Sequence, residues 1–134
     1  MSRASLLRLH EPFASGSTAS IHFGWLAPAR LVAVKRLHPH VADDELVVAR
    51  TVEHARLAMR VKHPNVVATL GIVQRRRELL CAMEYVPGAS LAEIAAEHGA
   101  IEPRIACAIV ASALRGLEAA HATRGVPGWR TLSP

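Results

Sequence analysis

The sequence predicts an α+β protein in which a five-stranded antiparallel sheet and one helix precede two further helices. Three observations support this fold class. In the first half, short segments of alternating apolar and polar residues are separated by turn residues, which is typical of strands. A helical pattern begins after Asp43 or Asp44 and ends before Pro64. Beyond Pro87-Gly88, apolar residues recur at helical spacing.

Composition places the chain among folded proteins. It has 134 residues, of which 51% are hydrophobic, so it is not disordered by composition. The net charge of +5 would suit a nucleic acid or an anionic membrane. However, the basic residues are dispersed, and the single cluster at 75–77 is followed by Glu78, so we expect a solvated hairpin tip and no nucleic-acid partner.

Cysteine spacing and hydropathy exclude other classes. Cys81 and Cys107 have no metal-ligand spacing with histidines, so we expect two buried, reduced thiols and no metal site. Residues 1–12 lack the apolar core of a signal peptide, and the apolar run at 105–114 is too short to span a bilayer. We therefore expect a cytoplasmic protein without a membrane partner.

The first two expected strands cover residues 5–13 and 19–26, joined by a turn of small residues at 14–18. Ile21, Phe23 and Trp25 fall on one face of the second strand, which indicates a half-buried strand. The third strand places Leu31, Ala33 and Lys35 on one face. A small alanine beside a lysine suits a flat aromatic ring that lies over the alanine while the ammonium group reaches an anion.

The remaining elements follow from caps and breakers. Asp43 or Asp44 can cap the long helix, and strands at 66–73 and 79–84 form a hairpin about residues 74–78. Ser90 and Glu93 form a capping box that opens a helix to about residue 97, and Pro103 starts a helix to about residue 123. The last helix carries an apolar stripe with small residues: Ile105, Ile109, Ser112, Gly116, Leu117 and Ala120.

Three motifs in order resemble a known family. VAVKRL at 32–37, an amphipathic helix with HPNVV at 63–67, and MEYVPGASL at 83–91 resemble the small lobe of a bacterial protein kinase of the eukaryotic Ser/Thr type. The resemblance implies a kinase-like small lobe over residues 1–87. It also implies an incomplete large lobe over residues 88–134, with two helices and a remnant of the catalytic loop.

The resemblance also implies a nucleotide site. In the family, the strand lysine holds the α- and β-phosphates of ATP and pairs with a glutamate of the next helix. The positions of this sequence that match ATP-contacting positions of the family are Gly16 in the phosphate loop, Ile21 and Ala33 over the base, Lys35, Met83 behind the adenine, the Glu84 carbonyl and the Val86 amide. Gly16 is the one remaining glycine of a three-glycine pattern, so a weakened phosphate clamp is expected.

Three departures from the family pattern predict that catalysis is absent. His54 stands where the family has the helix glutamate, and Glu53 is rotated away by about 100°. The tail at 128–134 resembles the catalytic loop, but Thr131 replaces its aspartate and cannot act as a carboxylate base. The metal-binding asparagine and the DFG aspartate have no counterpart in the 134 residues. We therefore expect no catalytic residues, no Mg²⁺ ligands and at most weak ATP binding.

These expectations lead to a truncated, inactive pseudokinase that acts as a binding or regulatory module. Its expected contact, with another protein chain or with itself, uses the helix face of Ile105, Ile109 and Leu117, because a large exposed apolar patch usually marks an interface. The alternatives are an ATP-binding kinase fragment completed by a partner chain, nucleotide binding without catalysis, and a gene remnant without a selected role.

Overall fold

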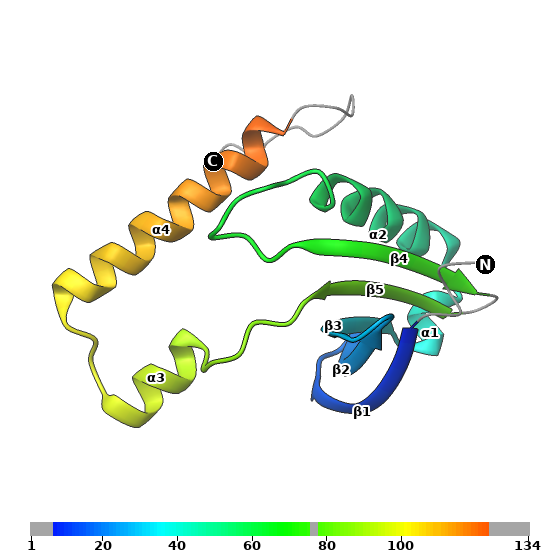
Figure 1. Cartoon of the computed structure of the whole chain (residues 1–134), viewed down its shortest axis with the longest axis horizontal. Helices are drawn as coiled ribbons and strands as arrows, with labels where there is room; N and C mark the ends of the chain where they lie inside the picture. Colours follow the sequence, from blue (N-terminus) through cyan, green and yellow to red (C-terminus); the bar gives the residue numbers. More distant parts are fainter. Residues whose placement is uncertain (1–6, 76–77, 124–134) are drawn as a thin grey trace.

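A curved antiparallel sheet with one long helix along it forms the larger part of the molecule, and two helices follow (Figure 1). The computed structural model describes residues 7–75 and 78–123. The strands are β1 (Leu7–Ser15), β2 (Ala19–Leu26), β3 (Arg30–Leu37), β4 (Thr69–Arg75) and β5 (Glu78–Glu84). The helices are α1 (Pro39–Ala42), α2 (Glu45–Ala58), α3 (Leu91–His98) and α4 (Pro103–Ala122).

The strands pair in the order β1-β2-β3-β5-β4, and each neighbouring pair is antiparallel. Alternate residues of β3 point to opposite faces, so the sheet has two apolar layers. Val32, Val34 and Leu80 form the first core cluster. Leu37 and Leu79 belong to the second cluster, which lies on the α2 side because Val48 and Val52 of α2 pack against it.

The burial of β2 differs from the sequence-based expectation. Ile21 and Phe23 are only half-buried, Trp25 is 44% exposed, and the buried residues between them are His22 and Gly24. The register of β1 is irregular between Leu9 and Pro12, and the carbonyl of His10 lies at this irregularity. His22 Nδ1 donates a hydrogen bond to that carbonyl at 2.9 Å, which leaves Nε2 of a neutral ring to accept from the Ser20 hydroxyl at 2.8 Å.

The long helix begins where its cap was predicted. The Asp44 side chain accepts hydrogen bonds from the amides of Leu46 and Val47 and thereby satisfies two otherwise unpaired helix donors. Between β3 and α2 lies α1, a single helical turn in which the His38 carbonyl accepts hydrogen bonds from the amides of residues 41 and 42. The buried or half-buried residues toward the sheet side recur at helical spacing in α2 and at its C-cap: Val48, Val52, Ala55 and the C-cap residue Met59.

The His63-Pro64-Asn65 corner holds α4 against the small lobe. The Asn65 amide donates to His63 Nδ1 at 3.1 Å, and its side-chain nitrogen donates to the carbonyl of Ser112 on α4 at 2.9 Å. Gly116 is buried at the same contact, where an added Cβ would meet the Asn65 carbonyl oxygen and a Val66 methyl at 3.0 Å. Small residues of the predicted stripe therefore allow this half of α4 to approach the corner closely.

The fourth strand begins three residues later than expected. Val66 to Ala68 are still part of the corner, because the Val66 amide donates to the His63 carbonyl and the Ala68 amide donates to the Glu84 carboxylate. The Glu84 amide in turn donates to the Ala68 carbonyl at 2.8 Å. Backbone groups that the sequence pattern assigned to a strand are thus satisfied by the corner and by the end of β5.

Apart from its contact at the corner, most of α4 is exposed within the described part of the chain. The large apolar side chains that remain accessible are Ile105, Ile109, Val110, Leu114 and Leu117. By length and composition, α4 is apolar enough to cross a membrane, in contrast to the expectation from its longest apolar run. Arg104, Arg115 and Glu118 lie along this helix, and Gly116 packs on the corner.

The close approach at Gly24 leads to a stability prediction. A Cβ at this position would lie 2.8 Å from a Val34 methyl and 3.2 Å from the Arg8 carbonyl oxygen. Gly24→Ala should therefore lower the free energy of unfolding by about 1–3 kcal/mol, as other overpacked cores do. Urea unfolding followed by circular dichroism measures this change.

The matched control is Gly71→Ala in β4, where an added Cβ meets nothing within 4 Å. This variant should keep or slightly raise the stability, because alanine restricts the unfolded chain more than glycine does. Equal stabilities for the two alanine variants would contradict the packing at Gly24.

Candidate functional site

The central strand places Lys35 between two side chains from its neighbours. In the sheet register, Lys35 lies opposite Ile21 of β2 and Cys81 of β5. Ala33, one step away on the same face, lies opposite Phe23 and Met83. Directly opposed residues of antiparallel strands project to the same face. We call this set of six side chains the lysine face: Ile21, Phe23, Ala33, Lys35, Cys81 and Met83.

The turn before β2 is tied to the end of β3. The Gly16 amide donates to the Ala19 carbonyl at 2.9 Å, which closes a turn shorter than the predicted one. The His38 ring nitrogen Nε2 donates to the Gly16 carbonyl at 2.9 Å, and the His38 amide donates to the Thr18 carbonyl at 3.0 Å. An added Cβ at Gly16 would be 3.8 Å from its nearest neighbour, so this conformation does not itself require a glycine.

The segment after β5 offers main-chain groups beside the lysine face. Val86 is 58% exposed, and outside the helices and strands no backbone hydrogen bond uses its amide within the described residues. Glu84 has a structural role in addition, since its carboxylate and its amide both bond to Ala68. A main-chain amide without a bond inside the described residues is able to bond the edge of a flat heterocycle.

Three aromatic rings form a cluster that was not predicted from the sequence. The ring centroids of Phe13 and Phe23 are 4.3 Å apart, and those of Phe23 and Tyr85 are 5.4 Å apart with an edge-on orientation. The cluster links β1, β2 and the segment after β5. Ala33, which lies opposite Phe23, is only 9% exposed. The surface expected to receive an aromatic ring is therefore largely covered by the chain's own side chains.

Lys35 has no acidic partner within residues 7–75 and 78–123. No ion pair or hydrogen bond joins its ammonium group to a carboxylate there, although the side chain is half-buried. On α2, His54 and Glu53 are both exposed and precede Ala55, which is buried toward the sheet. The structure thus does not bring a helix carboxylate to the lysine. Trp129 and Thr131 lie outside the described residues.

The two cysteines differ from the expectation of two buried thiols. Cys107 is exposed on α4, whereas Cys81 is half-buried on the lysine face. Burial raises the pKa of the Cys81 thiol, because desolvation disfavours the thiolate, and the positive charge of Lys35 partly opposes this rise. The described residues contain no group of three or more potential metal ligands.

The electrostatic coupling predicts how Cys81 reacts. Lys35→Met removes the charge that favours the thiolate, so the pKa of Cys81 rises further and its alkylation by iodoacetamide at pH 8 should become several-fold slower. Mass spectrometry of the alkylated peptides measures both cysteines in one sample. Cys107 serves as the internal control and should react at an unchanged rate. An unchanged rate at Cys81 would show that the lysine does not lie beside it.

Comparisons with known proteins agree with the architecture. The family model of the protein kinase domain matches residues 10–126. The chain is 34% identical over 103 residues to serine/threonine-protein kinase VIK of Arabidopsis thaliana, covering 77% of this chain and 24% of that protein. It is 31% identical over 113 residues to serine/threonine-protein kinase PkaB of Streptomyces coelicolor, covering 84% of this chain and 27% of that protein.

A solved structure shows the same fold. The crystal structure of Rad53 residues 1–466 in complex with AMP-PNP superposes with a TM-score of 0.75 and 18% identity, over 87% of this chain and 30% of that one. The predicted α+β small-lobe fold is thereby confirmed. The chain spans about a quarter of the length of the curated relatives named above. The matched domain, the order of its motifs and the arrangement of its strands show that the chain belongs to the protein kinase family.

Proposed function

We propose that this chain is a catalytically inactive, regulatory binding module of the protein kinase family. The observation that carries the proposal is the isolation of Lys35 from any carboxylate in the described part of the chain. The position that matches the family's helix glutamate is His54. Phosphoryl transfer depends on positioned charge around the phosphates, and the lysine–glutamate pair is one of its required parts.

The sequence of the catalytic-loop remnant supports the same proposal. Thr131 stands where the family resemblance places the aspartate that orients the substrate hydroxyl. A threonine hydroxyl is not ionised near neutral pH and does not serve as a carboxylate base. Two positions of the sequence, 54 and 131, thus lack the acidic groups that the reaction uses.

The proposal predicts no transfer of radiolabelled γ-phosphate from ATP to protein substrates by this chain.

The proposal also predicts a gain in nucleotide affinity for His54→Glu, because a carboxylate at this position can pair with Lys35 and hold its ammonium group toward the phosphates. We expect about fivefold tighter binding of Mg-ATP, which corresponds to about 1 kcal/mol. Thermal shift and fluorescence titration with a nucleotide analogue measure this gain.

The matched control is His98→Glu, since His98 is an exposed histidine of α3 that is not part of the lysine face. This variant should leave nucleotide affinity unchanged. Phosphate transfer by the wild-type chain that disappears in Lys35→Met would contradict the proposal directly.

Nucleotide binding without transfer is a second candidate function. The apolar side chains of Ile21 and Met83, the charge of Lys35 and the unpaired Val86 amide support it. Rad53, which shares the fold, was solved with AMP-PNP. The aromatic cluster over the Ala33 region and a turn with Gly16 as its single glycine favour weak binding. The alternative to an inactive module is an ATP-binding kinase fragment whose nucleotide site is completed by a partner chain.

The regulatory contact that we propose uses the exposed face of α4. Ile105, Ile109 and Leu117 are 55%, 37% and 50% exposed, and the corner of the small lobe contacts α4 at Ser112 and Gly116, beyond Ile105 and Ile109 along the helix. Apolar side chains of this size on one helix face favour contact with another polypeptide or with a second copy. A cytoplasmic location is part of this proposal, which treats α4 as a protein-binding helix and not as a membrane span.

Self-association through this face is a testable consequence. Replacing Ile105, Ile109 and Leu117 by serine should shift the chain toward the monomer, because it removes most of the apolar area of the contact. Size-exclusion chromatography with light scattering over a range of concentrations measures the shift. Leu46→Ser on α2 is the control, since Leu46 is 62% exposed and lies on another helix. A wild-type chain that stays monomeric and binds no partner protein would contradict the proposed role of α4.

A further inference from the structure

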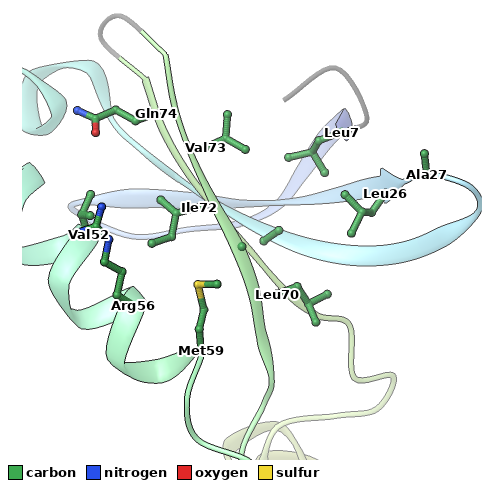
Figure 2. A pocket seen from close by; sticks show the side chains of 12 residues that line it. Leu7, Leu26, Ala27, Val52, Arg56, Met59, Leu70, Ile72, Val73 and Gln74 are labelled. Atoms are coloured by element: carbon green, nitrogen blue, oxygen red, sulfur yellow. The ribbon is translucent and has the colours of Figure 1, made fainter. Parts of the chain in front are cut away.

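A groove separate from the lysine face runs along β4. Its volume is about 520 Å³, and none of its lining residues belongs to the lysine face. Figure 2 shows that α2 residues line one side of β4 and that residues of β1 and β2 lie on the other side. The lining residues are Leu7, Leu26, Ala27, Val52, Arg56, Met59, Leu70, Gly71, Ile72, Val73, Gln74 and Ala82.

The groove follows the edge of the strand and not one of its faces. Five consecutive residues of β4, from Leu70 to Gln74, line it. Successive side chains of a strand point to opposite faces, so consecutive residues share one groove only if the groove extends around the strand's edge. Among the described strands, β4 pairs with β5 alone, which leaves its other edge unpaired. The pairing is irregular between Thr69 and Gly71, so the regular edge is the segment from Gly71 onward.

The two walls and the strand between them favour an extended apolar segment. Val52, Met59 and Ile72 line one side, while Leu7 and Leu26 line the other (Figure 2). A strand added to an exposed edge sends alternate side chains to these two walls and bonds its main chain to the edge. A helix would fill one wall and leave the main-chain groups of the edge without partners.

Charge identifies a further property of the occupant. Arg56 is the charged residue among those that line the groove, and no carboxylate pairs with it within the described residues. A charged guanidinium group in a groove whose other lining side chains, apart from Gln74, are apolar favours an acidic residue in the bound segment, through a bidentate contact. Gly71 leaves space beside the strand, since no atom lies within 4 Å of an ideal Cβ at this position.

We propose that the regular edge of β4 binds an extended segment of a partner protein by strand addition. The segment carries apolar residues on both faces and an acidic residue that contacts Arg56. The main-chain hydrogen bonds provide affinity, while the apolar walls and Arg56 select the sequence. This surface requires neither a nucleotide nor Lys35, so it is independent of the function proposed above.

The test uses a short fluorescein-labelled peptide of alternating valine and isoleucine with a glutamate at each end, and fluorescence anisotropy measures its binding to the whole chain. In an added strand, every second peptide amide faces β4. N-methylation of that alternate set should weaken binding by at least about tenfold, whereas methylation of the other set should change it little. Equal effects of the two sets, or no binding of the unmodified peptide, would overturn strand addition.

Protein variants locate the site. Gly71→Ile should keep the fold, because space is available for the side chain, and should abolish peptide binding by filling the groove. Gly16→Ala is the matched control outside the groove and should bind as the wild type does. Arg56→Glu should weaken binding, and a peptide with lysines in place of the glutamates should restore it. Peptide binding that is retained in Gly71→Ile would overturn the assignment of the site to the β4 edge. If the wild-type chain forms concentration-dependent dimers and Gly71→Ile abolishes them, the occupant is a second copy of this chain, which would also overturn the proposal.

Discussion

The antiparallel pairing of β2, β3 and β5 decides which groups can act together in this molecule. Lys35 lies in the central strand, and the register places Ile21 and Cys81 directly beside it. A slip of one residue would turn Lys35 toward the apolar layer of Val32 and Val34, where a charged ammonium group is strongly disfavoured. The burial of Val32 and Val34 therefore both specifies the register and keeps Lys35 on the half-buried lysine face.

The functional consequence is electrostatic. Among residues 7–75 and 78–123, no carboxylate pairs with the half-buried Lys35, so this lysine can attract an anion but lacks a described neighbour that would orient it and balance its charge. α2 is correctly placed to supply such a neighbour, since Ala55 and Val52 pack on the sheet side. Its amino acid at the matching position is His54, so the scaffold of the family is retained while the charge pattern is altered.

The three surfaces proposed for contacts, two on the small lobe and one on α4, differ in their chemistry. The lysine face combines one charge with apolar and aromatic side chains. The exposed large side chains of α4 are apolar, while Ser112 and Gly116 of the same helix contact the corner at Asn65. The groove along β4 adds an unpaired strand edge and Arg56. The proposed role in binding rests on these surfaces and on the absence of a carboxylate partner of Lys35 within the described residues.

Local patterns in the sequence were sufficient for the elements themselves. Alternation and turn residues located the five strands, and the Asp44 cap, the Ser90–Glu93 capping box and Pro103 located the helix starts, because these signals act over a few neighbouring residues. The shared face of Ala33 and Lys35 followed from periodicity once the strand was identified, whereas the place of Ile21 beside them was implied by the family resemblance.

Tertiary packing determined features that sequence periodicity does not predict: the buried side of β2, the start of β4 and the contacts between elements. The sequence alone did not show that His22 and Gly24, and not Ile21 and Phe23, form the buried side of β2, because both sides carry groups able to pack. The late start of β4 depends on bonds between Ala68 and Glu84, which are far apart in the chain. The aromatic cluster and the β4 groove likewise arise between elements. The sequence determined the elements and the chemical groups they carry, and the three-dimensional contacts determined which groups meet, because burial and long-range hydrogen bonds depend on the whole fold.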